Sequence, residues 1–259
     1  MERAKAAGFK ALMVTVDGAS SGNREYNNHN GFTMPFSVTR RNFFDIGSHP
    51  RWLLGVMGRY MLTTGMPMFE NYPAEARSRM TRGPMGKSSL RSDSVSWEDL
   101  AELRKIWPHP LIMKGMLNPD DARKAIDYGA DGILVSNHGG RNLDGVVSPL
   151  EVLPEIVDAV GSRATVLMDG GIMRGSDAVK ALSLGADAVL VGRAALYGLA
   201  VGGEAGASRA IDIFRDEMNR VMALLGCNGI EELGPQCLHF TDALLRPPQH
   251  SLEESSHAQ

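Results

Sequence analysis

The sequence predicts an α/β protein with a parallel β-sheet. Five short segments are apolar throughout, and each is followed by a polar or glycine-containing turn: residues 11–16, 111–114, 132–135, 165–168 and 188–191. Continuously apolar strands are buried on both faces, as they are in parallel sheets. The segments between the later strands have helical spacing and end at glycine, so strands and helices alternate.

A polar side chain stands at or just after the end of each predicted strand: Asp17, Lys114, His138, Asp169 and Arg193. An open doubly wound sheet binds its ligand at one switch point and does not need polar residues at every strand end. In a TIM (β/α)8 barrel these positions face one another. We therefore expect the C-terminal five βα units of a TIM barrel, strands 4 to 8, with three front units outside this sequence.

Local signals place the remaining elements. A helix is expected to end at Gly8, before the first strand, and Ser96 is a suitable N-cap for a helix over residues 97–106. Further helices are expected at 119–128, 149–160, 176–184, 194–201 and 208–225. The last of these is amphipathic and either caps the barrel or contacts a neighbouring copy, so we expect a homo-oligomer. Residues 1–245 are expected to form one domain, with a disordered tail at 246–259.

A long excursion, at about residues 36–95, interrupts this rhythm. Six of the fifteen methionines fall between Met57 and Met85, among aromatic side chains and arginines. Soft apolar side chains mixed with cations suit contact with an anionic membrane surface, which we place at residues 51–91. An active-site lid or a mobile loop is the alternative.

Composition excludes several classes of protein. A net charge of −3 gives no general attraction for nucleic acid. Cys227 and Cys237 form neither a metal-binding spacing nor a disulfide framework, and no metal is expected. The N-terminal residues lack the features of a signal peptide, and no apolar run approaches the ~20 residues that span a bilayer. We expect a cytoplasmic protein, either free or peripheral on the cytoplasmic face of the membrane.

The run Ser136–Asp144 carries the most chemistry. His138 and Arg141 follow a buried strand, and two glycines after the histidine permit a tight turn. Neutral imidazole is a suitable general base, and guanidinium binds a carboxylate through two hydrogen bonds. Taken alone, the pair could equally be a buried structural histidine beside a surface arginine.

Two glycine-containing loops predict a phosphate site. Asp169–Gly175 and Val191–Arg193 follow the strands that would be the seventh and eighth of a barrel, where phosphate groups are commonly bound. Lys114, at the end of the strand that would be the fifth of a barrel, needs a negative partner, and the edge of a reduced flavin would provide one.

Together, these residues resemble those of the FMN-dependent L-2-hydroxy acid oxidases and dehydrogenases, especially the (S)-mandelate and bacterial L-lactate dehydrogenase branches. The matching stretches are Thr15–Asp17, Gly22–Glu25, Met113–Gly115, Ser136–Asp144, Asp169–Gly171, Arg174–Asp177 and Gly192–Arg193. The resemblance implies oxidation of a mandelate- or lactate-like acid to the 2-oxo acid, with FMN as electron acceptor. The excursion favours a membrane quinone as the next acceptor.

The resemblance also implies a role for each matching residue. His138 would be the base and Asp17 the carboxylate that orients it, while Arg24 and Arg141, with His138, would bind the substrate. The residues implied in FMN binding are Thr15, Lys114, Ser136, Asp169, Gly170, Gly171, Met173, Gly192 and Arg193. Met173 departs from the family, which has a phosphate-binding arginine there, so one phosphate cation is lost unless Arg174 replaces it.

Three alternatives remain open from the sequence. The chain could be a truncated, non-catalytic piece of such an enzyme, because three barrel strands are absent. It could belong to an oxidase that uses oxygen. Another phosphate-binding barrel, such as an FMN-dependent isomerase, would share the glycine loops but would not explain the histidine with two arginines.

Overall fold

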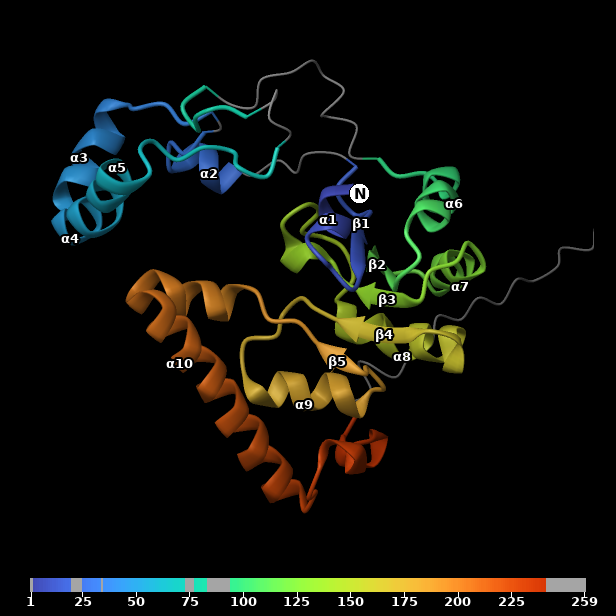
Figure 1. Ribbon diagram of the computed structural model, residues 1–259. Coiled ribbons are helices and arrows are strands. Elements are labelled where there is room, and N and C mark those ends of the chain that lie inside the picture. Colours follow the sequence, from blue (N-terminus) through green and yellow to red (C-terminus); the bar gives the residue numbers. More distant parts are fainter. Residues whose placement is uncertain (1, 20–24, 34, 73–76, 83–93, 241–259) are drawn as a thin grey trace, which may run out of the picture. The chain divides into compact units, whose positions relative to one another are not determined.

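The computed structural model describes residues 2–19, 25–33, 35–72, 77–82 and 94–240 (Figure 1). The expected tail at 246–259 and the expected substrate residue Arg24 lie outside these ranges. The chain divides into two units. Unit 1 consists of Met1–Asp17 and Val95–Gln259, and unit 2 of Gly18–Ser94.

Unit 1 contains one five-stranded sheet, and each neighbouring pair of strands is parallel. Its strands are β1 (Leu12–Thr15), β2 (Leu111–Met116), β3 (Gly132–Val135), β4 (Thr165–Met168) and β5 (Ala188–Val189). They are hydrogen-bonded in chain order, without the reversal that a doubly wound sheet requires. This order confirms part of an α/β barrel, with β1 and β5 at the two ends of the sheet.

The predicted helices are present in unit 1 with small shifts in their ends. They are α1 (Glu2–Ala6), α6 (Trp97–Ile106), α7 (Pro119–Asp127), α8 (Pro149–Val160), α9 (Gly175–Ser183) and α10 (Arg193–Leu225). The two helices expected after the last strand, at 194–201 and 208–225, are joined in α10, but Gly202 and Gly203 between them have non-helical backbone angles. Short helical turns follow at η4 (His138–Gly140), η5 (Gly161–Arg163), η6 (Ile230–Glu232) and η7 (Pro235–Cys237).

Capping explains where α6 begins. The Ser96 hydroxyl accepts a hydrogen bond from the Asp99 amide at 3.2 Å, and the Asp99 carboxylate accepts one from the Ser96 amide at 2.9 Å. This reciprocal capping box satisfies two amides that have no partner within the helix. The hydrogen bond from the Ser96 main chain lowers the pKa of the Asp99 carboxyl most, and the Ser96 side chain lowers it further.

The core lies between the sheet and the helices that cover it. β3 is buried along its whole length, which explains why its sequence is apolar at every position. α7 packs against β2 and β3, and α8 packs against β3 and β4 (Figure 1). The end strands β1 and β5 keep partly exposed residues in an alternating pattern. The centre of the sheet is therefore a complete core, while its two ends are less covered.

Unit 2 contains the excursion. It begins with α2 (Glu25–His29) and α3 (Arg40–Ser48), followed by an uninterrupted run of α4 (Pro50–Trp52), the π-helical η1 (Leu53–Gly58) and α5 (Arg59–Thr63). A single antiparallel bridge joins Met68 and Arg79. None of the described helices in either unit has the length and apolar character needed to cross a bilayer.

Candidate active site

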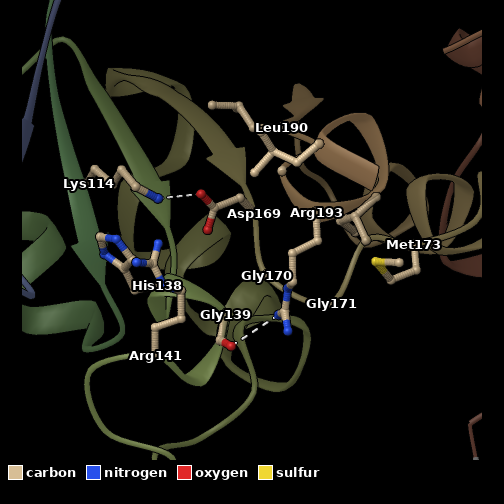
Figure 2. Close-up of a pocket in the computed structure, with 13 residues that line it drawn as sticks. Lys114, His138, Gly139, Arg141, Asp169, Gly170, Gly171, Met173, Leu190 and Arg193 are labelled. Carbon is tan, nitrogen blue, oxygen red and sulfur yellow. Dashed lines mark hydrogen bonds and ion pairs between the residues drawn. The ribbon is translucent and has the colours of Figure 1, made fainter. Parts of the chain in front are cut away.

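The carboxyl-terminal part of the sheet brings most of the predicted residues of unit 1 to one cavity (Figure 2). Because neighbouring strands are parallel, the residue after each strand emerges at the same edge. The cavity has a volume of about 220 Å³. Its lining includes nine of the residues expected from the sequence: Lys114, His138, Arg141, Asp169, Gly170, Gly171, Met173, Gly192 and Arg193.

His138 is held by a carboxylate on another strand. Its Nδ1 lies 3.1 Å from Oδ1 of Asp17, which follows β1, and both side chains are largely buried. In a neutral imidazole whose Nδ1 donates a hydrogen bond to the Asp17 carboxylate, the lone pair is on Nε2. This is the tautomer that a general base requires.

The backbone around His138 is also constrained. His138 has a φ of +57°, a conformation that costs roughly 1–3 kcal/mol for a residue with a Cβ. Two side chains fix this turn: Ser136 Oγ accepts from the His138 amide at 3.1 Å, and Asn137 Oδ1 accepts from the Gly139 amide at 3.0 Å. The chain thus stabilises a strained conformation at the residue with the clearest chemical role.

Lys114 forms a second polar centre in the same cavity. Its ammonium donates to Ser136 Oγ at 2.8 Å and forms an ion pair with Asp169. Both charged side chains are largely buried, so each needs the other. One oxygen of each carboxylate, Asp17 Oδ2 and Asp169 Oδ1, is buried without a hydrogen-bond partner among the described residues. These oxygens can accept hydrogen bonds from a ligand.

The glycine loops form the opposite wall of the cavity. Gly170 and Gly171 have φ values of +92° and +78°, which residues with a Cβ rarely adopt. A Cβ on Gly170 would also lie 2.8 Å from Asn137 Oδ1. The long helix α10 begins at Arg193, so its first amides and its positive dipole end lie beside these loops. This arrangement is suited to an anion such as phosphate.

Arg193 is the guanidinium of this anion site. Its Nη2 donates to the carbonyl oxygen of Gly139 at 3.0 Å (Figure 2). Arg174 does not substitute for the cation missing at Met173, because its guanidinium pairs with Glu217 of α10 at 2.6 Å. The pKa of Glu217 is lowered, mainly by the hydrogen bond from the Gly175 amide. Burial acts in the opposite direction, and the hydrogen bond from Arg174 lowers the pKa further.

Some predicted residues lie elsewhere. Thr15 ends β1 opposite Lys114 in the sheet register and is exposed, and it does not line the cavity. Ser136 is fully buried beneath the cavity and acts through its two hydrogen bonds.

Two residues that support the site, Asn137 and Asn142, were not predicted from the sequence. Asn142 Nδ2 donates to the carbonyl oxygen of Asp17 at 2.8 Å, and Asn137 supports the histidine turn. Both lie within the run Ser136–Asp144, and this position could have indicated a role in the site. The contact of Asn142 with Asp17 could not be predicted, because it joins residues far apart in the chain.

The model of the FMN-dependent dehydrogenase family matches residues 1–240 of this sequence. The chain belongs to this family. It is 42% identical over 241 residues to the L-lactate oxidase of Nostoc sp., covering 93% of this chain and 60% of that protein. It is 40% identical over 252 residues to the (S)-mandelate dehydrogenase of Pseudomonas putida, covering 97% of this chain and 62% of that protein.

Solved structures agree with this membership. A crystal structure of the monotopic membrane protein (S)-mandelate dehydrogenase superposes with a TM-score of 0.82 at 40% identity, covering 92% of this chain and 62% of that chain. A structure of mandelate oxidase with (S)-2-phenylpropionate gives a TM-score of 0.64 at 32% identity, covering 90% of this chain and 58% of that chain. The chain thus spans about three-fifths of the length of the curated relatives it matches.

The cavity of this chain fits FMN, the cofactor of its family. Asp169 Oδ1 is a buried acceptor without a partner among the described residues, as a hydroxyl-bearing ribityl chain would require. Lys114 could stand beside the flavin edge that becomes negative on reduction. The amides of the glycine loops, the start of α10 and Arg193 could hold the phosphate.

Proposed function

We propose that the protein containing this chain oxidises an L-2-hydroxy acid, of the mandelate or lactate type, to the 2-oxo acid with FMN. The observation that supports this most directly is the 3.1 Å contact between His138 Nδ1 and Asp17, together with the position of His138 and Arg141 in the lining of one cavity. The names of the relatives, lactate and mandelate dehydrogenases and oxidases, agree with this substrate class.

The residues divide the work. Arg141 binds the substrate carboxylate, and a planar guanidinium can do so through two hydrogen bonds. Arg24, from the same predicted substrate set, is the second cation. The Nε2 atom of His138 takes one proton from the bound hydroxy acid, and Asp17 stabilises the imidazolium that results. When bound, FMN supplies a two-electron acceptor.

A flavin assay tests this function. The chain, preceded by the N-terminal segment of its own reading frame or of (S)-mandelate dehydrogenase, is loaded with FMN and mixed anaerobically with (S)-mandelate or L-lactate. We expect the flavin absorbance to bleach, and we expect His138→Gln to slow this by about 10²–10⁴-fold with FMN still bound. Loss of FMN binding in a folded, complete chain would contradict the proposal, and so would wild-type bleaching by the His138 variant.

We also propose that unit 2 contacts a membrane and that a quinone accepts the electrons. The region expected from the sequence was 51–91, and its described part includes a helical run with large exposed apolar side chains: Trp52, Leu54, Val56, Tyr60, Met61 and Leu62. Phe43 and Phe44 of α3 are also exposed. Arg51 and Arg59 add positive charge, which suits an anionic lipid surface. The related (S)-mandelate dehydrogenase is described as a monotopic membrane protein.

Vesicle binding tests the membrane proposal. The triple variant Trp52→Ser, Leu54→Ser, Leu62→Gln is expected to lose most cosedimentation with vesicles that contain phosphatidylserine. Each Å² of apolar surface that enters the membrane contributes about 25 cal/mol to the binding free energy, and the three substitutions remove much of this surface. Val201→Gln is the matched control, because Val201 of α10 is 91% exposed and Leu62 is 89% exposed. Vesicle binding by the triple variant equal to that of the wild type would contradict this contact.

The electron acceptor is tested separately. Oxygen uptake faster than reduction of a quinone analogue would favour an oxidase.

A further inference from the structure

The structure brings together two cysteines whose sequence spacing suggested no pairing. Cys227 follows the end of α10, directly after Gly226, whose left-handed conformation turns the chain. Cys237 ends η7. Their sulfur atoms lie 3.8 Å apart, and both side chains are half-buried. Neither residue lines the active-site cavity.

The loop that joins the two cysteines is held by its own hydrogen bonds. The Glu232 carboxylate accepts from the Asn228 amide at 2.9 Å, and the Glu232 carbonyl accepts from Gln236 Nε2 at 3.1 Å. The Cys237 amide donates to the Gly234 carbonyl at 2.9 Å. The folded loop therefore keeps both thiols near each other, whereas an unfolded loop would bring them together only transiently.

We propose that Cys227 and Cys237 form a dithiol–disulfide pair that a low-molecular-weight disulfide, such as glutathione disulfide, oxidises. One thiolate attacks the glutathione disulfide, which forms a mixed disulfide and releases one glutathione. The second cysteine then attacks the protein sulfur of the mixed disulfide, which closes the protein disulfide and releases the second glutathione. Two protein thiols are oxidised, one glutathione disulfide is reduced to two glutathiones, and the thiol protons pass to the products.

The disulfide would connect the end of α10 to a segment that packs on α9. η7 contacts α9, and α9 begins at Gly175, immediately after the loop that lines the active-site cavity. Glu217 of α10 already accepts a hydrogen bond from the Gly175 amide at 2.8 Å. Closing the disulfide adds a covalent connection at the far end of the same pair of helices. Its expected effect is to reduce opening of residues 227–238.

Redox titration tests the proposal with the chain as it is. The reduced protein is equilibrated with mixtures of reduced and oxidised glutathione, quenched in acid, alkylated, digested and mapped by mass spectrometry. We expect a peptide pair joined through Cys227 and Cys237, lighter by two hydrogens than the reduced peptides. The ratio of oxidised to reduced glutathione at which half of the protein contains the disulfide should be about tenfold lower, or lower still, in buffer than in denaturant. The reason is that the folded loop raises the effective concentration of one thiol at the other.

Two further measurements complete the test. Cys227→Ser and Cys237→Ser should each leave the remaining cysteine carrying glutathione, which shows that the oxidant reaches both thiols. In the wild-type chain, amide hydrogen exchange of residues 227–238 should be slower after oxidation. Equal half-oxidation ratios in buffer and denaturant would overturn the proposal, as would glutathione adducts on both cysteines without a joined peptide.

Discussion

Replacing Gly115 by alanine tests how closely β2 packs against Asp17, the carboxylate that contacts His138. Gly115 lies in β2 with a φ of +104°. A Cβ at this position would lie 2.6 Å from Asp17 Cβ, 2.7 Å from Asp17 Cγ and 3.0 Å from the Asp17 amide nitrogen. Backbone and a β-carbon cannot rotate away, so the end of β1 would have to move.

The cost has two parts. An alanine held at this backbone conformation is strained by about 1–3 kcal/mol. Carbon atoms normally approach to about 3.5–4.0 Å, so the overlap with Asp17 is about 1 Å, and relieving it should cost a further ~1–3 kcal/mol. A total of about 2–6 kcal/mol is a large fraction of the stability of a typical domain. For a urea slope of about 2–3 kcal/mol per M, the midpoint should fall by roughly 0.7–3 M.

Urea denaturation followed by tryptophan fluorescence measures this shift. Trp107 is fully buried in the core of unit 1, and a Trp52→Phe background removes the signal from unit 2. Gly145→Ala is the matched control, because nothing lies within 4 Å of its added Cβ and its φ is not in the left-handed region. The control should shift stability by less than about 0.5 kcal/mol. Equal urea midpoints for the Gly115 and Gly145 variants would show that a Cβ at residue 115 does not clash with Asp17.

Three other variants test neighbouring parts of the site. Lys114→Met leaves the buried Asp169 carboxylate unpaired and should destabilise unit 1 by about 1–3 kcal/mol, measured by urea denaturation; a second change, Asp169→Asn, should recover part of this loss. Met173→Arg should bind FMN about tenfold more tightly in flavin fluorescence titrations through one added charge-assisted hydrogen bond, whereas Met173→Leu should not. Glu217→Gln should lower the melting temperature at neutral pH. Since the folded pKa of Glu217 is lowered from 4.5, its stabilisation is present above that value and is lost as pH falls through the folded pKa; a variant gap that does not shrink in acid would contradict this assignment.

The order of the elements could be predicted because their signals are local. An apolar strand, a glycine stop or a serine cap reports on the residues within one element. The bounds of α6 matched the prediction, while β5 ended at Val189, two residues before the expected end of the apolar run. Residues at strand ends could be assigned to one cavity because parallel strands share a common edge.

The supporting contacts could not be predicted in the same way. Asn142 holds the main chain of Asp17, Arg193 donates to the carbonyl of Gly139, and the pairing of Arg174 with Glu217 leaves Met173 without a substitute cation. Each of these contacts depends on the rotamer of a long or amide side chain and on how two distant segments pack. No spacing within one segment reports such an arrangement.

The residue types and the order of the elements were enough to predict part of an α/β barrel with a histidine, a carboxylate and an arginine at its strand ends, because these signals are local. The resemblance of those residues to a known family implied FMN. The contacts between individual atoms are set by the tertiary structure. It set the 3.1 Å contact between His138 Nδ1 and Asp17, left one oxygen of Asp169 without a partner among the described residues, and placed Cys227 beside Cys237. These contacts depend on how segments pack against one another in the fold, and no local sequence pattern specifies that packing.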